Sequence, residues 1–177
     1  SVDWGFESLR ARQYQYFRKV FIKNMPKYND KDIDLMQEAL KEAEIAYSHQ
    51  EVPVGAVAVY QNKIIGRAHN QKEELHDPTA HAEILAIQQA AKYLGSWHLE
   101  DIDLYVTLEP CPMCAYAMLQ SRINRLIFGT PDPKAGAVGS IINIVQDKRF
   151  NHQIEVVSGV LKKECNLILQ KFFQERR

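Results

Sequence analysis

The chain has 177 residues, with 22 Lys and Arg against 22 Asp and Glu, so its formal net charge at pH 7 is zero. This length suits one domain with a buried core, and zero net charge excludes a nucleic-acid surface built on overall basicity, so any such surface must be local. No apolar run approaches the roughly 18 residues of a membrane span, and the charged N-terminal stretch is not a secretory signal. Three cysteines favour a reducing compartment over a disulfide framework. We therefore expect a soluble, cytoplasmic protein with no membrane partner.

The first stretch, residues 1–31, differs from the rest because aromatic residues alternate with Arg and Lys. Ser8 to Ile22 has the pattern of a short amphipathic helix. Such mixing can mark a nucleic-acid surface, where rings stack on bases and cations meet phosphates. It is also common on half-buried helices packed against a domain, and we favour that interpretation. We divide the chain into an N-terminal extension, 1–31, and a domain, 32–177.

Helices and strands alternate along that domain. A helix with an apolar stripe runs from Asp32, its expected cap, to Tyr47. Two strands in a hairpin follow, Val52 to Tyr60 and Ile64 to Ala68. The further expected strands are Leu104 to Leu108, Arg125 to Gly129 and Ile154 to Val157, and the further helices are Thr79 to Tyr93, Pro112 to Arg122, Ser140 to Gln146 and Leu161 to Arg177. This order predicts a layered α/β domain with a mixed sheet of five strands.

Two short motifs carry the chemistry, His81-x-Glu83 and Pro110-Cys111-x-x-Cys114. Zinc in a catalytic site takes three nitrogen or sulfur ligands and keeps a fourth position for water. His81, Cys111 and Cys114 supply three such ligands and leave Glu83 free to move protons. The combination is the pattern of zinc nucleobase deaminases. His81 and Glu83 are expected in the first turn of their helix, and the cysteines at the start of the next one, where the helix dipole stabilises thiolates.

Other roles for these residues carry less weight. A lone C-x-x-C can be a redox pair, but such pairs are not normally accompanied by H-x-E. A structural zinc site would need a fourth Cys or His at metal-finger spacing, and the sequence has none. The third cysteine, Cys165, is expected to be a buried apolar residue.

The motifs imply hydrolytic deamination of a ring carbon that carries an amino group. Zinc can lower the pKa of a bound water from about 15.7 to about 7, which makes hydroxide available at neutral pH. Glu83 would take the water proton, deliver it to the ring nitrogen and later help to protonate the departing ammonia. The product would be a ring carbonyl.

Longer stretches resemble the bacterial tRNA-specific adenosine deaminase family. They are Glu51 to Val57, His76 to Glu83 and Tyr105 to Cys114, with Ser121-Arg122-Ile123 and Phe128-Gly129 also fitting. The resemblance covers about Ile33 to Arg177. It implies the three-layer α-β-α cytidine-deaminase-like fold with a five-stranded mixed sheet, and hydrolysis of the wobble adenosine in a tRNA anticodon to inosine. It also implies a homodimer with one zinc ion per subunit and the tRNA anticodon stem-loop as partner.

The resemblance further implies residues that contact the substrate. Asn70 stands at the family's substrate-contacting asparagine, although an asparagine that holds the loop is the alternative. Val54 would pack on the base or, as the alternative, in the core. Ala80 and Ala82 would offer backbone groups. Asp132 and, nearby, Lys134 would meet the substrate strand, with a solvated loop carboxylate as the alternative for Asp132.

The end of the chain completes the resemblance. Phe172, Phe173, Arg176 and Arg177 match the family's helix that contacts the anticodon stem, and nearby Lys residues make this end locally basic. The phenylalanines are as well explained by packing in the core or against a second subunit.

Two other functions remain open from the sequence. A free-base or nucleoside deaminase, acting on guanine or cytosine, would share the zinc motifs and differ in the loops and last helix. A non-catalytic zinc-binding RNA adaptor on the same fold would have no use for the proton shuttle Glu83.

Overall fold

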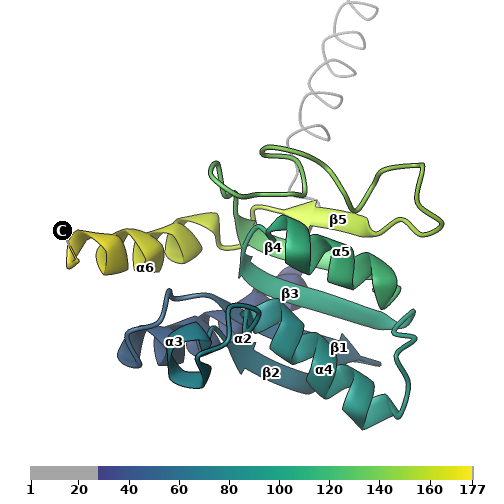
Figure 1. Ribbon diagram of the computed structural model, residues 1–177, viewed down its shortest axis with the longest axis horizontal. Helices are drawn as coiled ribbons and strands as arrows, with labels where there is room; N and C mark the ends of the chain where they lie inside the picture. The colour runs from purple at the N-terminus through teal and green to yellow at the C-terminus, as the bar shows by residue number, and fades with distance from the viewer. Residues whose placement is uncertain (1–27, 177) are drawn as a thin grey trace, which may run out of the picture.

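The computed structural model describes residues 28–176. Its centre is a five-stranded sheet in the order β2-β1-β3-β4-β5 (Figure 1). β1 pairs antiparallel with β2 and β3, whereas β3, β4 and β5 are parallel. The strands are β1 (Gly55–Tyr60), β2 (Lys63–His69), β3 (Ile102–Leu108), β4 (Arg125–Thr130) and β5 (Glu155–Ser158). The predicted mixed sheet is confirmed.

Helices cover both faces of the sheet and make three layers (Figure 1). One face is covered by α4 (Ala82–Leu94) and α5 (Pro112–Gln120), and the other by α2 (Asp30–Ser48) and α6 (Lys162–Gln174). Because successive strand side chains point to opposite faces, the β1 residues divide between the two cores: Ala56 and Ala58 pack towards α4, and Val57 and Val59 towards α2. A one-turn helix, α3 (Lys72–Leu75), follows β2.

Gly55 allows α2 to lie directly on β1. A Cβ atom added at Gly55 would be 2.0 Å from the carbonyl oxygen of Ala39 and 2.4 Å from the amide nitrogen of Ala43. Both contacts are with backbone, which cannot rotate away, so a side chain at this position would push the helix off the sheet.

Gly55→Ala is therefore expected to destabilise the fold by about 3 kcal/mol or more, because the added methyl group forces a backbone shift. Urea unfolding followed by circular dichroism measures it. Gly95→Ala is the matched control: open space surrounds Gly95, but its φ is +63°, so alanine should cost only about 1 kcal/mol. Equal losses in the two variants would contradict the packing explanation.

The start of α2 differs from the prediction. Asn29, not Asp32, is the N-cap, and the two residues form a capping box in which each side chain accepts the other's backbone N–H, at 3.0 and 3.1 Å. Asp32 is buried in the first turn, and its second oxygen accepts the Tyr105 hydroxyl at 2.8 Å. The predicted cap at Asp32 was wrong because this reciprocal arrangement needs the acid three residues after the cap.

The predicted helix Ser140 to Gln146 was also wrong. This stretch consists of turns and an isolated bridge between Val138 and Asn143. The backbone N–H groups of Val138 and Ser140 both donate to the buried carboxylate of Glu109. The side chain of Glu109, distant in the sequence, thus holds this backbone segment in a non-helical conformation.

The other helices and strands predicted for the domain are present, with bounds within three residues of the prediction as far as the chain is described. The helix predicted from Ser8 to Ile22 lies outside the described residues. None of the helices in the described part of the chain is long and apolar enough to cross a membrane.

Candidate active site

Two helix N-termini meet on the same face of the sheet and bring the motif residues together. His81 is the N-cap of α4, Cys111 is the N-cap of α5, and Cys114 lies in the first turn of α5. The Nδ1 atom of His81 is 3.4 Å from Sγ of Cys114 and 3.7 Å from Sγ of Cys111. The three ligand atoms all lie within 4.8 Å of one another.

These distances fit a tetrahedral zinc ion. With zinc bonds of about 2.0 Å to nitrogen and about 2.3 Å to sulfur, tetrahedral angles separate a nitrogen ligand from a sulfur ligand by about 3.6 Å. The two measured separations, 3.4 and 3.7 Å, bracket that value. The predicted ligand set is thus already arranged as a metal would require.

The local backbone favours a thiolate at Cys111. Pro112 occupies the first turn of α5, where its missing N–H is not needed. In the described structure neither His81 nor Cys111 caps its own helix with its side chain, so the free N–H groups and the helix dipole act on the sulfur atoms. Hydrogen bonding from Cys114, with a further contribution from His81, lowers the pKa of Cys111 to about 4.

Glu83 lies beside the ligands in the first turn of α4 and is 4% exposed. Burial raises the pKa of its carboxyl group, while the charge of His81 and a hydrogen bond with Cys114 oppose that shift. A buried carboxyl group with a raised pKa is suited to accept a proton and give it up again.

Asn70 joins the start of α4 to the segment before β1. Its Oδ1 accepts the N–H of Ala82 at 2.9 Å, and its Nδ2 donates to the carbonyl of Val52 at 3.1 Å. This arrangement supports the interpretation that the asparagine holds the loop. A second amide proton and a second lone pair remain for a ligand, so the two roles are compatible.

The other residues expected around the base are buried. Val54 is 4% exposed and packs in the core beside α4, and Ala80 and Ala82 are covered completely or nearly so. The carbonyl of Ala80 accepts the N–H of Gln71 at 3.0 Å, and the N–H of Ala82 bonds to Asn70. The backbone groups expected to face a substrate thus already hold the loop around His81.

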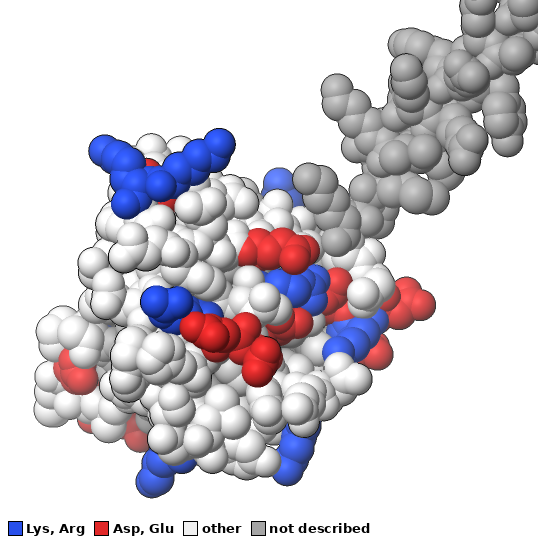
Figure 2. Space-filling model, turned by 90° about the vertical axis from the view of Figure 1, so that its right-hand side faces the viewer, with Lys and Arg blue, Asp and Glu red and all other residues white. Residues whose placement is uncertain are grey.

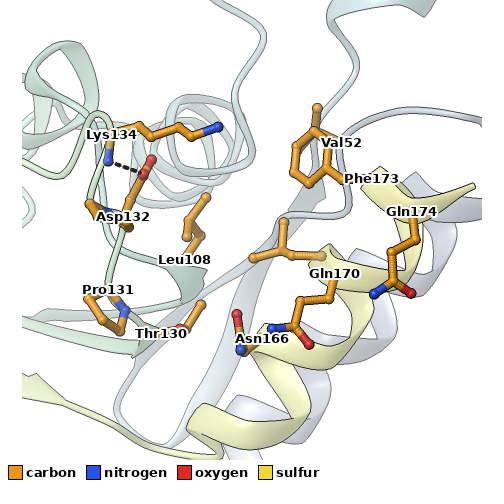
Figure 3. Close-up of a pocket in the computed structure, with 12 residues that line it drawn as sticks. Val52, Leu108, Thr130, Pro131, Asp132, Lys134, Asn166, Gln170, Phe173 and Gln174 are labelled. Atoms are coloured by element: carbon orange, nitrogen blue, oxygen red, sulfur yellow. Dashed lines mark hydrogen bonds between the residues drawn. The ribbon is translucent and has the colours of Figure 1, made fainter. Parts of the chain in front are cut away.

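A cleft of about 540 Å³ lies between the loop after β4 and α6 (Figure 3). Asp132 and Lys134 line it from the loop and Phe173 from the helix, so the structure brings together three residues predicted to contact the tRNA. The carboxylate of Asp132 accepts the N–H of Lys134 at 2.9 Å, which closes a turn (Figure 3). Leu108, which also lines the cleft, is three residues before Cys111 in the chain, but none of the three metal ligands lines the cleft.

Glu109 is a residue to which the sequence analysis gave no role. Its buried carboxylate accepts the N–H groups of Asp132, Val138 and Ser140, each at 3.0 Å, and the Ser140 hydroxyl. Burial alone would raise the pKa of Glu109, but these hydrogen bonds lower it below its usual value. The sequence feature that could have indicated this role is the position of Glu109, an acidic residue directly between a buried strand and Pro110.

Glu109→Gln is expected to destabilise the protein by about 3 kcal/mol, because the amide would turn an N–H₂ group towards backbone donors and leave them unpaired. Thermal unfolding and proteolysis within residues 131–140 measure it. Glu100→Gln, at an exposed acid, should change stability by less than about 0.5 kcal/mol. Unchanged proteolysis of the loop in Glu109→Gln would show that Glu109 does not organise it.

Part of the surface predicted on α6 for contact with RNA is buried in the structure. Phe172 is 3% exposed and packs against Tyr47 and Phe173, with ring centroids 6.1 and 5.4 Å apart. Because its ring is covered by the protein, Phe172 fits the alternative given from the sequence, packing in the core. Arg176 lies over that ring at 4.0 Å and donates to the carbonyl of Gln50, which ties the helix to α2. The prediction for Arg177 lies outside the described residues.

Comparison with known proteins agrees with this site. The family model of the MafB19-like deaminases matches residues 29–177. The tRNA-specific adenosine deaminase of Bacillus subtilis (strain 168) is 54% identical over 142 residues, which are 80% of this chain and 88% of that protein. The tRNA-specific adenosine deaminase of Haemophilus influenzae is 49% identical over 147 residues, 82% of this chain and 85% of that protein.

A solved structure gives the same result at the level of the fold. It comes from work on A-to-I editing by tRNA:A34 deaminases at the wobble position of transfer RNA. The match has a TM-score of 0.75 and 46% sequence identity, and it covers 77% of this chain and 99% of that one. The family model matches residues 29–177, and the two relatives share about half of their residues with this chain over most of its length. The chain therefore belongs to the MafB19-like deaminases and to the tRNA-specific adenosine deaminase family.

Proposed function

We propose that the protein is a zinc-dependent hydrolase that converts the wobble adenosine of a tRNA anticodon to inosine. The observation that carries the chemistry is the His81, Cys111 and Cys114 set at tetrahedral zinc separations, beside the buried carboxyl group of Glu83. The named substrate of its relatives supports the choice of tRNA adenosine. One zinc ion per subunit at the deaminase site follows from the one His-Cys-Cys set among the described residues.

The zinc ligands and Glu83 have different roles in the proposed reaction. Zinc, when bound by the three ligands, supplies a Lewis acid that lowers the pKa of a water molecule. Glu83 accepts a proton from that water and delivers it to N1 of adenine while the oxygen adds to C6. Glu83 would then take the remaining proton of the hydroxyl group on C6 and give it to the amino group, so that the carbon–nitrogen bond breaks, the C6 carbonyl forms and ammonia leaves. Water and adenosine thus give inosine and ammonia.

The raised pKa of Glu83 suits this shuttle. Burial disfavours the charged carboxylate and raises its pKa, which favours uptake of a proton by this group. The free hydrogen-bonding positions of Asn70 are placed to orient the base, since this side chain is fixed against the first turn of α4.

Recognition of the anticodon stem-loop is assigned to local groups around the cleft. Asp132, Lys134 and Phe173 line it, and a ring such as that of Phe173, which is 51% exposed, can stack on a base. The face shown in Figure 2 carries Lys, Arg, Asp and Glu side by side, as expected for a chain with no net charge. Exposed cations at the cleft and along α6, such as Lys134, Lys162 and Lys171, are therefore proposed to meet the phosphates.

A homodimer is proposed through the exposed end of α5. Trp97, Tyr116 and Phe150 are 62, 45 and 37% exposed, and the rings of Tyr116 and Phe150 are 5.7 Å apart. Large apolar side chains gathered on a surface are typical of subunit contacts. Light scattering should give a dimer for the protein and a monomer for Tyr116→Glu; a monomeric protein would reject the proposal.

A cytoplasmic location is proposed because none of the three cysteines is in a disulfide, which suits a reducing compartment.

The substrate is tested directly by incubating the protein with a tRNA-Arg transcript that has adenosine at the wobble position, beside free adenosine, guanine and cytosine. Inosine at that single position is the expected product. Turnover of a free base with intact tRNA would instead identify a small-molecule deaminase, and zinc-dependent tRNA binding without any product would identify an RNA adaptor.

A further inference from the structure

A second group of metal-binding side chains lies away from the deaminase site. It is formed by His49 at the C-terminal end of α2, His69 at the end of β2 and Glu74 in α3, and one ligand atom from each lies within 4.8 Å of the others. Among the residues that the structure describes, only this group and the deaminase ligands meet that condition. The group shares no residue with the deaminase ligands.

Two of its ligand atoms are already separated as a metal requires. Nδ1 of His49 is 3.5 Å from Oε2 of Glu74, and two ligands held about 2.1 Å from a tetrahedral ion are about 3.4 Å apart. The side chains of His49 and Glu74 are 50 and 49% exposed, so both can turn to complete the geometry with His69. The rings of His49 and His69 already meet edge to face, with centroids 5.8 Å apart.

His69 is held in a form that can bind a metal. Its Nδ1 is 3.2 Å from the carboxylate of Glu42, which is the arrangement in which a carboxylate orients a metal-binding histidine. With the proton on Nδ1, the other nitrogen carries a free lone pair. In the described part of the chain, that Nε2 atom is the only buried side-chain nitrogen or oxygen without a hydrogen-bond partner. Such an atom is costly to leave unsatisfied.

Glu74 is also held in place. The carboxylate of Glu51, which is buried, accepts the backbone N–H groups of Glu73 and Glu74 at 2.8 and 3.0 Å. These bonds fix the one-turn helix α3 against the end of α2. The three ligands therefore come from three fixed elements. The buried carboxylate of Glu42 contacts His69, and that of Glu51 accepts hydrogen bonds from the backbone of α3.

We propose that His49, His69 and Glu74 form a second metal site that takes a divalent transition ion such as zinc. Two imidazoles and one carboxylate suit zinc, cobalt or nickel, whereas calcium and magnesium prefer oxygen ligands. The bound ion links α2, β2 and α3, directly before Asn70 in the chain, and so stabilises the folded state by an amount that grows with the logarithm of its concentration above the dissociation constant.

Metal content tests the proposal. Protein without an affinity tag is equilibrated with Zn²⁺, passed over a desalting column and analysed for zinc and protein. The wild type is expected to hold one zinc per chain more than His49→Gln and Glu74→Gln, whose affinity for that ion should fall at least tenfold by calorimetry. His98→Gln is the matched control, because His98 is equally exposed and also pairs with a glutamate, Glu100, at 3.7 Å; it should match the wild type.

A second measurement separates this ion from the deaminase site. Cys111→Ser should lose one zinc and keep the one lost in His49→Gln, and wild-type protein should gain thermal stability with Zn²⁺ but not with Ca²⁺. The same zinc content in wild type, His49→Gln and Glu74→Gln would overturn the proposal, as would loss of this zinc in Cys111→Ser. Because only the difference between variants is read, the result does not depend on the deaminase activity.

Discussion

Glu83→Gln is expected to lower the turnover of wobble adenosine by roughly 10²- to 10⁴-fold, the range typical of a lost general acid–base group, while the zinc content stays at the wild-type level. Glutamine has the same shape as glutamate but cannot accept the proton of water. Glu83 is 4% exposed and is not one of the ligands, so the metal site should survive. Inosine formation at saturating tRNA, measured with zinc content on the same preparation, checks both parts.

The control for this prediction is Glu44→Gln, at an exposed acid of α2 far along the chain from the site, which should keep full activity. A Glu83→Gln enzyme that retained wild-type turnover would remove Glu83 from the mechanism. Loss of zinc together with activity would show instead that this carboxyl group supports the metal and not the proton transfer.

Cys111→Ser is expected to lose zinc and activity together. The pKa of the Cys111 thiol is lowered to about 4 by hydrogen bonding from Cys114 and His81, so a thiolate is ready for the metal, whereas a serine hydroxyl stays protonated at neutral pH. Two ligands, His81 and Cys114, then remain, which is fewer than the three of a catalytic zinc site. We expect at least a tenfold loss of zinc affinity and no measurable inosine, by metal analysis and the tRNA assay.

Cys165→Ala provides the matched control for a lost thiol. Cys165 is buried on α6 and packs on the opposite face of the sheet from the ligands, so its removal should leave one zinc at the deaminase site and full activity. Deaminase-site zinc retained in Cys111→Ser would contradict the assigned ligand set.

The hydrogen bonds of Glu109 indicate that the site depends on residues outside the two zinc motifs. Its four hydrogen bonds hold the loop that carries Asp132 and Lys134, and Glu109 is only two residues from Cys111. One short segment therefore positions both a metal ligand and the wall of the cleft. We infer that changes at Glu109 affect tRNA affinity as well as stability.

The sequence by itself determined the chemistry and most of the secondary structure. His81, Glu83, Cys111 and Cys114 are recognisable because their spacing is local: each pair lies within one turn of a helix start, where the backbone alone sets the direction of the side chains. The strands and helices of the domain were predictable for the same reason, since apolar periodicity is a property of neighbouring residues.

Tertiary structure alone decided the features that join distant residues. Glu109 bonds to Ser140, 31 residues later, and that contact overrides the helical pattern of Ser140 to Gln146. Phe172 is covered by Tyr47 from the other end of the domain, which decides between its two sequence interpretations in favour of core packing. His49, His69 and Glu74 have no motif spacing and meet only because α2, β2 and α3 end side by side. A local pattern holds no information on contacts of this kind, because folding of the whole chain brings them together.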